Sequence, residues 1–306
     1  MKDKKVIIID PVHPDLVSSL KKKFITVNYF PEINYQKLSK IIKNYDVIIL
    51  RSGLKLDKYL FDRAKSLKII ARAGVGMDNI DINEAKKKKI KYFNIPSQSN
   101  SSVAEHAFGL LYSAARKISL CDRLLRKNIW KKKEMYGYEL SNKNLGIVGL
   151  GRIGNKVASL GKKFNMKIYA NVKNINKKRK RILMKKKIIL TSLKHLLKIS
   201  DFVVVAVPLT LKTQNLLNKK NLVYLKKSSI IINISRGGII NEKHLYDLLK
   251  TKKIFAAATD VFKKEKKMNK LFKLENIVVT SHIGAMTYEA QKRIAVVLEE
   301  KLLKVV

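Results

Sequence analysis

Three side chains that could together move a proton and hold a carboxylate stand shortly after apolar runs of strand length. Arg236 follows the run Ile230–Ile234, while Glu265 and His282 come within six residues of the ends of two later runs. The carboxyl ends of parallel strands meet at one edge of an open sheet, where ligands bind. We therefore expect Arg236, Glu265 and His282 to lie together in one crevice.

These three side-chain types suit the interconversion of a hydroxyl and a carbonyl group. An imidazole moves a proton near neutral pH, and a carboxylate bonded to its other nitrogen fixes the tautomer and favours the charged form. A guanidinium can hold a substrate carboxylate with two forked donors and polarise the carbonyl. We interpret the trio as catalytic. The alternative is that His282 caps a turn and Arg236 pairs with a surface acid.

A glycine-rich segment follows the apolar run Leu145–Gly149 and precedes a helical pattern. Gly149 permits a tight turn, Gly151 lets the backbone approach a pyrophosphate, and Gly154 lets helix and strand pack closely. The amides at the start of the helix would then face the phosphates. An ordinary glycine-rich turn is the weaker interpretation. The residues expected to contact a dinucleotide here are Gly149, Gly151, Arg152, Ile153 and Gly154.

The acidic residue that usually binds the ribose, about 20 positions after these glycines, is missing. Val172 stands at its place, at the end of the next apolar run. One interpretation is an NAD enzyme with weaker ribose anchoring. The other is an NADP enzyme whose phosphate is held by Lys173, Lys177, Lys178 or Arg179. We favour NAD, with poor discrimination against NADP.

Short β-branched runs alternate with helix-length segments along the chain and form two series. The first series is expected at Val6–Asp10, Ile25–Tyr29, Asp46–Leu50, Lys68–Ala71 and Ile90–Phe93. The second is expected at Leu145–Gly149, Lys167–Asn171, Ile188–Leu190, Phe202–Val207, Ile230–Ile234, Ile254–Thr259 and Ile277–Thr280. Continuous apolar strands of this kind indicate parallel sheets covered on both faces. The pattern predicts an α/β chain with two doubly wound parallel-sheet domains.

A long helix is expected between the two series, from Ser102 to about Lys127. Ser102 and Glu105 have the spacing of a capping box, in which the serine side chain accepts a backbone hydrogen bond at the helix start. We interpret His106, which lies on this helix, as structural.

The composition carries 66 Lys and Arg against 23 Asp and Glu, a formal net charge of +43 over 306 residues. Such a charge could serve nucleic-acid or membrane-surface binding. The lysines, however, are spread along the chain together with many Asn and Ile, as AT-rich codons would produce. We expect no specific nucleic-acid partner and no membrane partner.

The location of the protein is expected to be cytoplasmic. No apolar stretch approaches the roughly 20 residues of a membrane helix, and the N-terminus lacks the features of a signal peptide. Cys121 is the only cysteine, which excludes an internal disulfide and suits a reducing compartment.

Four successive segments resemble, in order and separation, the signatures of D-2-hydroxyacid dehydrogenases: Gly149–Gly154, Asn233–Gly238, Asp260–Glu265 and His282–Ala285. The resemblance covers nearly the whole chain. It implies that the arginine binds and polarises a 2-oxo acid, that the glutamate orients the histidine, and that the histidine is the acid and base. The further cofactor contacts implied are Val207, Pro208, Ile234, Ser235, Asp260, Gly284 and Ala285.

The same resemblance implies a domain organisation and an oligomeric state. A flavodoxin-like substrate domain would comprise 1–96 plus 286–306, and a Rossmann-type cofactor domain would comprise 97–285. The active site would lie in the cleft between them, without a metal. The family also implies a homodimer, formed through the long helix and its surroundings.

Within the family, the segments 51–53, 73–81 and 99–105 resemble the phosphoglycerate dehydrogenase branch. This branch implies oxidation of 3-phospho-D-glycerate with NAD, the first step of serine biosynthesis. An arginine suits a substrate that carries a phosphate and a carboxylate, although a solvated loop charge is the alternative for that residue. The implied substrate contacts are Arg51, Ser52, Val75, Gly76 and Asn100.

Two other functions stay open at this point. A glyoxylate or hydroxypyruvate reductase would prefer unphosphorylated acids, and an NAD(H)-sensing binding protein would need no proton relay. Three positions also depart from the family pattern, because Val172 replaces the ribose acid while Lys266 and Ser281 replace prolines. The sequence stops at Val306, so the C-terminal regulatory domains of longer relatives are expected to be absent.

Overall fold

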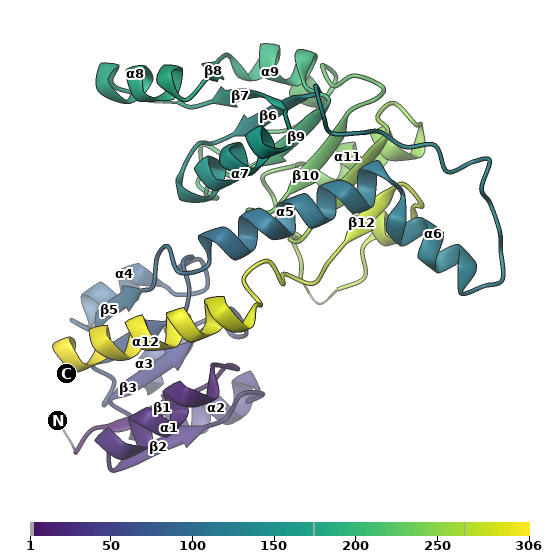
Figure 1. Cartoon of the computed structure of the whole chain (residues 1–306). Helices are drawn as coiled ribbons and strands as arrows, with labels where there is room; N and C mark the ends of the chain where they lie inside the picture. Colours follow the sequence, from purple (N-terminus) through teal and green to yellow (C-terminus); the bar gives the residue numbers. More distant parts are fainter. Residues whose placement is uncertain (1–2, 174, 266) are drawn as a thin grey trace. The chain divides into compact units, whose positions relative to one another are not determined.

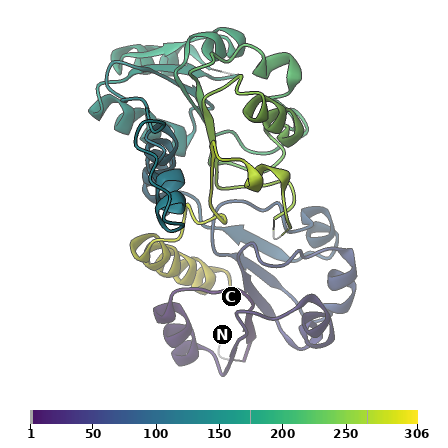
Figure 2. The same ribbon diagram turned by 90° about the vertical axis from the view of Figure 1, so that its right-hand side faces the viewer.

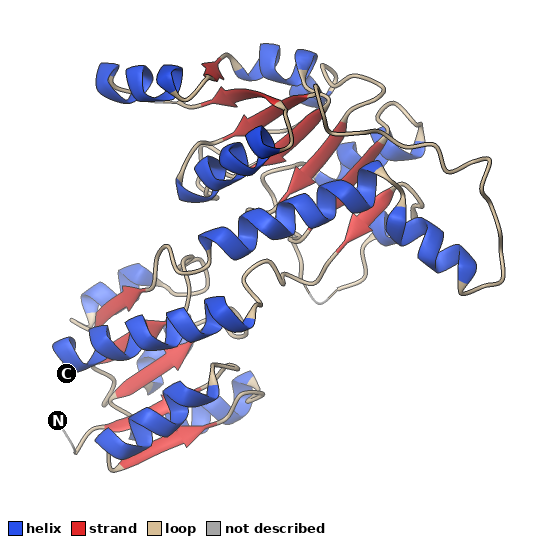
Figure 3. Ribbon diagram, in the orientation of Figure 1, coloured by secondary structure: helices blue, strands red, loops and turns tan. Residues whose placement is uncertain are grey.

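The computed structural model describes residues 3–173, 175–265 and 267–306, so the departure at Lys266 lies outside the described residues. The chain divides into two compact units, one formed by Met1–Ser99 with Ala285–Val306 and the other by Asn100–Gly284. Figure 1 follows the chain through both units, and Figure 3 shows that each consists of a sheet with helices around it.

The first unit contains a five-stranded parallel sheet in the order β2-β1-β3-β4-β5. Its strands are β1 (Lys5–Ile8), β2 (Thr26–Tyr29), β3 (Val47–Leu50), β4 (Ile69–Arg72) and β5 (Lys91–Asn94). Side chains alternate between the two faces of a strand, and so Ile7 and Val6 enter different apolar cores. This strand order is that of flavodoxin-like folds, with the switch point between β1 and β3.

Helices cover both faces of this sheet. One face packs against α1 (Pro14–Lys23) and α12 (Tyr288–Val305), which bury Leu20 and Leu298. In Figure 2 the yellow helix α12 lies beside this sheet, although it comes from the opposite end of the chain. The other face packs against α2 (Tyr35–Ile41), α3 (Lys58–Arg63) and α4 (Ile82–Lys87).

The second unit contains a seven-stranded parallel sheet in the order β12-β11-β10-β9-β6-β7-β8. Its strands are β6 (Asn144–Val148), β7 (Lys167–Asn171), β8 (Ile188–Leu190), β9 (Phe202–Val205), β10 (Ile230–Asn233), β11 (Ala256–Thr259) and β12 (Ile277–Val279). The strand order reverses between β6 and β9, which is the switch point of a Rossmann-type sheet.

Helices again cover both faces. One face packs against α9 (Leu193–Ile199), α10 (Lys219–Leu222) and α11 (Glu242–Lys250), and the other faces α5 (Asn100–Ala115) and α7 (Arg152–Lys163). Helix α8 (Lys177–Lys185) joins β7 to β8. The predicted fold class is confirmed, and each of the twelve expected strands lies within two residues of its expected ends.

The single long helix expected from Ser102 to Lys127 is wrong. The structure has two helices, α5 and α6 (Ile118–Leu125), with a left-handed break at Lys117, where φ is 54°. The carbonyl of Ala115 accepts a hydrogen bond from the Tyr138 amide, and a Cβ on Gly137 would come within 2.2 Å of that carbonyl oxygen. The returning chain therefore docks where the helix would have continued.

The expected capping box is also wrong. Helix α5 begins at Asn100, so Ser102 lies inside its first turn. The Ser102 hydroxyl donates to the carbonyl of Gly284 at 2.6 Å instead of accepting a bond at the helix start. This contact ties the first turn of α5 to the segment that follows β12.

Candidate active site

Strands β10, β11 and β12 place the expected catalytic residues at one edge of the sheet. The three strands are adjacent and parallel, and their registers align Asn233 with Thr259 and Thr259 with Val279. Arg236, Glu265 and His282 all follow the carboxyl ends of these strands. The structure thus brings the loops that carry the three side chains to the edge where ligands bind in open parallel sheets.

Glu265 and His282 form a hydrogen-bonded pair. The Nδ1 atom of His282 lies 2.8 Å from Oε1 of Glu265, and the two side chains are 30% and 41% exposed. An ionised carboxylate accepts hydrogen bonds but cannot donate them, so Nδ1 carries the hydrogen of this bond. The other ring nitrogen, Nε2, is then the atom of His282 that can take up or release a proton.

The backbone at His282 adopts a conformation that non-glycine residues rarely take, with φ at 59°. The next two amides hold it there, because Ile283 N–H donates to Oδ1 of Asp260 at 2.8 Å and Gly284 N–H donates to Oδ2 at 2.9 Å. Burial raises the pKa of Asp260, but the hydrogen bonds it accepts, including one from Thr280, outweigh burial and lower that pKa overall. Asp260 is therefore a buried, charged anchor for the His282 segment.

The turn that carries Arg236 is closed by hydrogen bonds of its own. The Asn233 side chain donates to the Arg236 carbonyl at 3.0 Å and accepts from the Ser235 amide at 3.1 Å. The Ser235 hydroxyl donates to the Val207 carbonyl, and a Cβ on Gly237 would come within 2.0 Å of the Phe262 carbonyl group. This turn is consequently fixed against the loops after β9 and β11.

The glycine-rich turn after β6 has the geometry that a dinucleotide needs. A Cβ on Gly154 would lie 2.2 Å from the Gly149 carbonyl oxygen, and Gly149 itself has φ at 94°. A Cβ on Gly151 would meet nothing within 4 Å, so the start of α7 opens onto space. Backbone amides at such a helix start bind phosphate, and the residues present therefore fit a pyrophosphate-containing cofactor.

The ribose position differs from the usual acidic one. Val172 directly follows β7 and is half-buried. Arg179, near the start of α8, donates from its guanidinium to the Leu150 carbonyl in the glycine-rich turn. The missing carboxylate is thus accompanied by a cation close to the phosphate-binding turn.

Two of the expected substrate residues lie at the switch point of the first unit's sheet. Arg51 and Ser52 follow β3, and the side chain of Asp10, which follows β1, accepts from the Arg51 and Gly53 amides at 2.5 and 3.3 Å. Burial raises the pKa of Asp10 despite these bonds and the nearby arginines. The side chain of Asn79 donates to the Arg51 carbonyl at 2.8 Å, which fixes the loop from its other side.

The guanidinium of Arg51 donates to the Pro11 carbonyl at 3.2 Å and lies 2.9 Å from the sulfur of Met286. Burial lowers the pKa of Arg51, and Asp10 opposes this effect. A cavity of about 390 Å³ within the same unit is lined by Arg51 and His13, among other residues. The other expected substrate residues lie elsewhere: Val75 and Gly76 follow β4, and Asn100 begins α5.

The sequence analysis did not predict the contacts that the side chains of Asp10, Thr280 and His106 make with these loops. An acidic residue at the end of the first apolar strand was a usable signal for Asp10. The contacts of His106 with the segment after β12 depend on packing between residues 174 positions apart, which periodicity does not report. Within the described part of the chain, no cluster of three metal-ligating side chains is present, nor does any described helix have the length and apolarity needed to span a membrane.

Comparison with known proteins gives a family match. The family model for the NAD-binding domain of D-isomer specific 2-hydroxyacid dehydrogenases matches residues 108–284. That segment contains the glycine-rich turn and the loops that carry Arg236, Glu265 and His282. The match therefore covers more than half of the chain and most of the candidate site.

Two curated relatives have nearly the same sequence identity to this chain but different names. The D-3-phosphoglycerate dehydrogenase of Methanocaldococcus jannaschii is 39% identical over 302 residues, which cover 98% of this chain and 57% of that protein. The hydroxypyruvate reductase of Thermotoga maritima is 38% identical over 304 residues, which cover 98% of this chain and 97% of that protein. The chain thus spans little more than half the length of the first relative.

A solved structure extends the likeness to the fold. The D-lactate dehydrogenase from Aquifex aeolicus, crystallised with NAD and lactic acid, superposes with a TM-score of 0.84 at 26% identity. The alignment covers 98% of this chain and 94% of that one.

Proposed function

Because the chain belongs to the D-isomer specific 2-hydroxyacid dehydrogenases, we propose that it oxidises 3-phospho-D-glycerate to 3-phosphooxypyruvate with NAD. This reaction opens serine synthesis, and we propose a cytoplasmic location for it. The observation that carries the substrate assignment is Arg51, a half-buried cation at the β1/β3 switch point. An arginine there suits a doubly anionic phosphate ester better than a plain hydroxy acid.

In this proposal, residues of the chain move the proton and bind the charged groups of the substrate. In the oxidation, Nε2 of His282 takes the hydroxyl proton, while Glu265 at Nδ1 stabilises the imidazolium that forms. Arg236 binds the substrate carboxylate and polarises the oxygen at the reacting carbon. The nicotinamide ring supplies the hydride chemistry when the cofactor is bound, and the turn at Gly149–Gly154 would hold its pyrophosphate.

Hydroxypyruvate or glyoxylate reduction is the second candidate. The relative named hydroxypyruvate reductase matches over nearly its whole length, at almost the same identity as the phosphoglycerate enzyme. A sensor that binds NAD(H) without turnover is disfavoured, because it would need no Glu265–His282 pair. The test is kcat/KM for 3-phosphoglycerate, glycerate, lactate and glycolate, and for hydroxypyruvate and glyoxylate in reduction, with both NAD and NADP cofactors. We expect phosphoglycerate to lead, and a stronger preference for unphosphorylated acids would transfer the assignment to the reductases.

The cofactor preference can be tested at Val172. Valine neither accepts hydrogen bonds from the ribose nor repels a 2′-phosphate, so we expect NAD to be preferred by less than about tenfold. Val172→Asp should raise the ratio of kcat/KM for NAD over NADP by about tenfold, the effect of one hydrogen-bonded group of roughly 1–2 kcal/mol. The exposed Val223, which receives the same charge in Val223→Asp, is the control. A wild type that prefers NADP more than about tenfold would contradict the NAD assignment alone.

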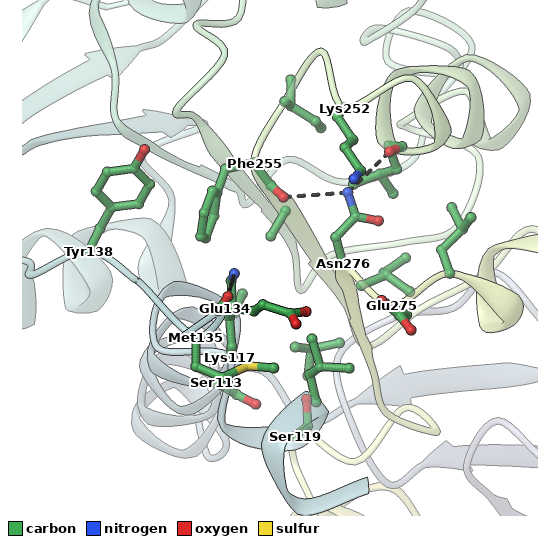
Figure 4. A pocket seen from close by; sticks show the side chains of 18 of the residues that line it. Ser113, Lys117, Ser119, Glu134, Met135, Tyr138, Lys252, Phe255, Glu275 and Asn276 are labelled. Atoms are coloured by element: carbon green, nitrogen blue, oxygen red, sulfur yellow. Dashed lines mark hydrogen bonds between the residues drawn. The ribbon is translucent and has the colours of Figure 1, made fainter. Parts of the chain in front are cut away.

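We also propose a homodimer, supported by an apolar surface around α6. No residue of α6 is buried, and Ile118, Leu125, Ile129, Trp130 and Tyr136 are all exposed. A cavity of about 880 Å³ lies beside them, lined by α5, α6 and the segments that begin β11 and β12. Figure 4 shows Phe255 and Met135 facing into this cavity. A second copy of the chain would cover this surface, which lies at the amino ends of β11 and β12, opposite to the catalytic loops.

Light scattering should then give a mass of about twice the 35.0 kDa chain. Leu125→Glu places a charge in the proposed interface and should shift the equilibrium toward monomers at micromolar concentration, because burying an unpaired charge is costly. Val223→Glu places the same charge at an exposed site outside α6 and should leave the mass unchanged. A wild-type monomer would contradict the proposal.

A further inference from the structure

Helix α5 touches the segment that carries His282 through two side chains one turn apart. Ser102 donates to the Gly284 carbonyl at 2.6 Å, and both residues are buried. Four residues later, Nε2 of His106 lies 3.1 Å from Oγ1 of Thr280 and 3.3 Å from Oδ1 of Asp260. Residues four apart share one face of a helix, so this face of α5 is built against the segment 280–284.

The hydrogen-bond donors in this cluster follow from the chemistry of its members. The Thr280 hydroxyl donates its single hydrogen to Oδ1 of Asp260 at 2.7 Å. Because the Asp260 carboxylate only accepts, the hydrogen between His106 and its two neighbours must sit on Nε2 of His106. That N–H points toward both Thr280 Oγ1 and Asp260 Oδ1, and it therefore restricts the orientation of the carboxylate.

The orientation of Asp260 is passed directly to His282. Each carboxylate oxygen accepts one of the two backbone amides that follow His282, whose own φ is 59°. The three residues pack closely, since a Cβ on Gly284 would lie 3.0 Å from Oδ2 of Asp260 and 3.5 Å from Cδ2 of His106. A carboxylate that rotates would release at least one of these amides.

We propose that His106 is a positioning residue for the reaction: by fixing the Asp260 carboxylate, it holds the backbone that aims His282 at its Glu265 partner and at the substrate. This inference rests on the proposed dehydrogenase function, in which His282 moves the proton. It assigns a specific role to His106, a largely buried side chain that the sequence pattern alone indicates only as structural.

The test compares His106→Leu with His106→Gln. Leucine removes the donor, whereas glutamine places an amide N–H near the former Nε2. A displacement of the reacting group by about 1 Å lowers rates by up to 10²-fold, so we expect His106→Leu to lose about tenfold or more in kcat. The dissociation constant for NADH, measured by fluorescence, should change by a smaller factor than kcat, because the phosphate-binding turn at Gly149–Gly154 is untouched while Asp260 and Gly284 are themselves expected cofactor contacts. His106→Gln should recover most of kcat, and His195→Leu, on the surface helix α9, should keep wild-type kcat.

Equal losses in the leucine and glutamine variants, or an unchanged kcat in both, would overturn the proposal. Should His106→Leu fold poorly, Thr280→Val gives the second route, because it removes the hydroxyl between His106 and Asp260 with little change in shape. We expect a similar loss of kcat, again larger than the change in the dissociation constant for NADH.

An activity-independent measurement separates this inference from the proposed function. Amide hydrogen exchange at Ile283 and Gly284 should become faster in His106→Leu and stay slow in His106→Gln, because the exchange reports the bonds to Asp260. Faster exchange in a protein that oxidises no 2-hydroxy acid would refute the function and keep the positioning contact. Unaltered exchange in His106→Leu would refute the contact whatever the activity.

Discussion

Replacing His282 with alanine is expected to lower kcat by about 10²–10⁴-fold, the usual contribution of a general acid–base group. The methyl group of alanine cannot accept the hydroxyl proton. Glu265 also loses the imidazole that lies 2.8 Å away, so no ring connects this carboxylate to the substrate. The dinucleotide should still bind, because the turn at Gly149–Gly154 follows a different strand. The measurements are kcat at saturating substrate and the dissociation constant for NADH.

The matched control is His195→Ala, which removes an imidazole from helix α9 without touching the catalytic loops. It should leave kcat unchanged. The assignment of His282 would be wrong if His282→Ala kept more than about a tenth of wild-type kcat while chemistry limits the rate, which a deuterated substrate can establish. A large loss of NADH affinity would instead indicate that the alanine collapses the segment held by Asp260.

The strands of both sheets could be predicted because a buried parallel strand is a short, continuous apolar run that can be recognised from neighbouring residues alone. Runs such as Ile230–Ile232 are apolar on both faces and are separated by helix-length segments, so the number of strands and their order along the chain follow without tertiary information. The three glycines of the phosphate turn were equally accessible. Each one has a separate steric reason, and the structure places Gly154 against the carbonyl of Gly149 as that reasoning requires.

The errors arose where distant segments compete with local preference. Periodicity continues through Lys117, but the chain that returns at Tyr138 takes the carbonyl of Ala115, and the helix breaks there. Ser102 has the local spacing of a cap, yet its hydroxyl is used by Gly284, 182 residues away. The structural interpretation of His106 is not contradicted, but only the folded chain shows which carboxylate this side chain faces.

The charge of the chain limits what can be read from any one cation. With 66 Lys and Arg in 306 residues, a basic side chain near a proposed anion site is weak support unless the fold holds it there. Arg51 meets that condition, because Asp10 and Asn79 fix the backbone around it and its guanidinium is packed on Pro11 and Met286. Its substitution therefore separates a specific phosphate contact from the general attraction of a +43 protein for anions.

Arg51→Ala is expected to raise KM for 3-phosphoglycerate by about ten- to a hundredfold and to leave KM for D-glycerate nearly unchanged. A hydrogen bond to a charged group contributes roughly 1.5–3 kcal/mol, and each 1.4 kcal/mol corresponds to about a tenfold change in affinity. The control is Lys43→Ala, which removes the same charge from an exposed residue four positions before β3, on the side of that strand opposite to Arg51. Both variants lower the net charge by one, so a loss that they share reflects long-range attraction of the anion rather than a contact. Steady-state KM for the two acids, measured at several salt concentrations, distinguishes the two effects. Equal losses for the phosphorylated and plain acids in Arg51→Ala would show that this arginine does not bind the phosphate, and the reductase assignment would then be preferred.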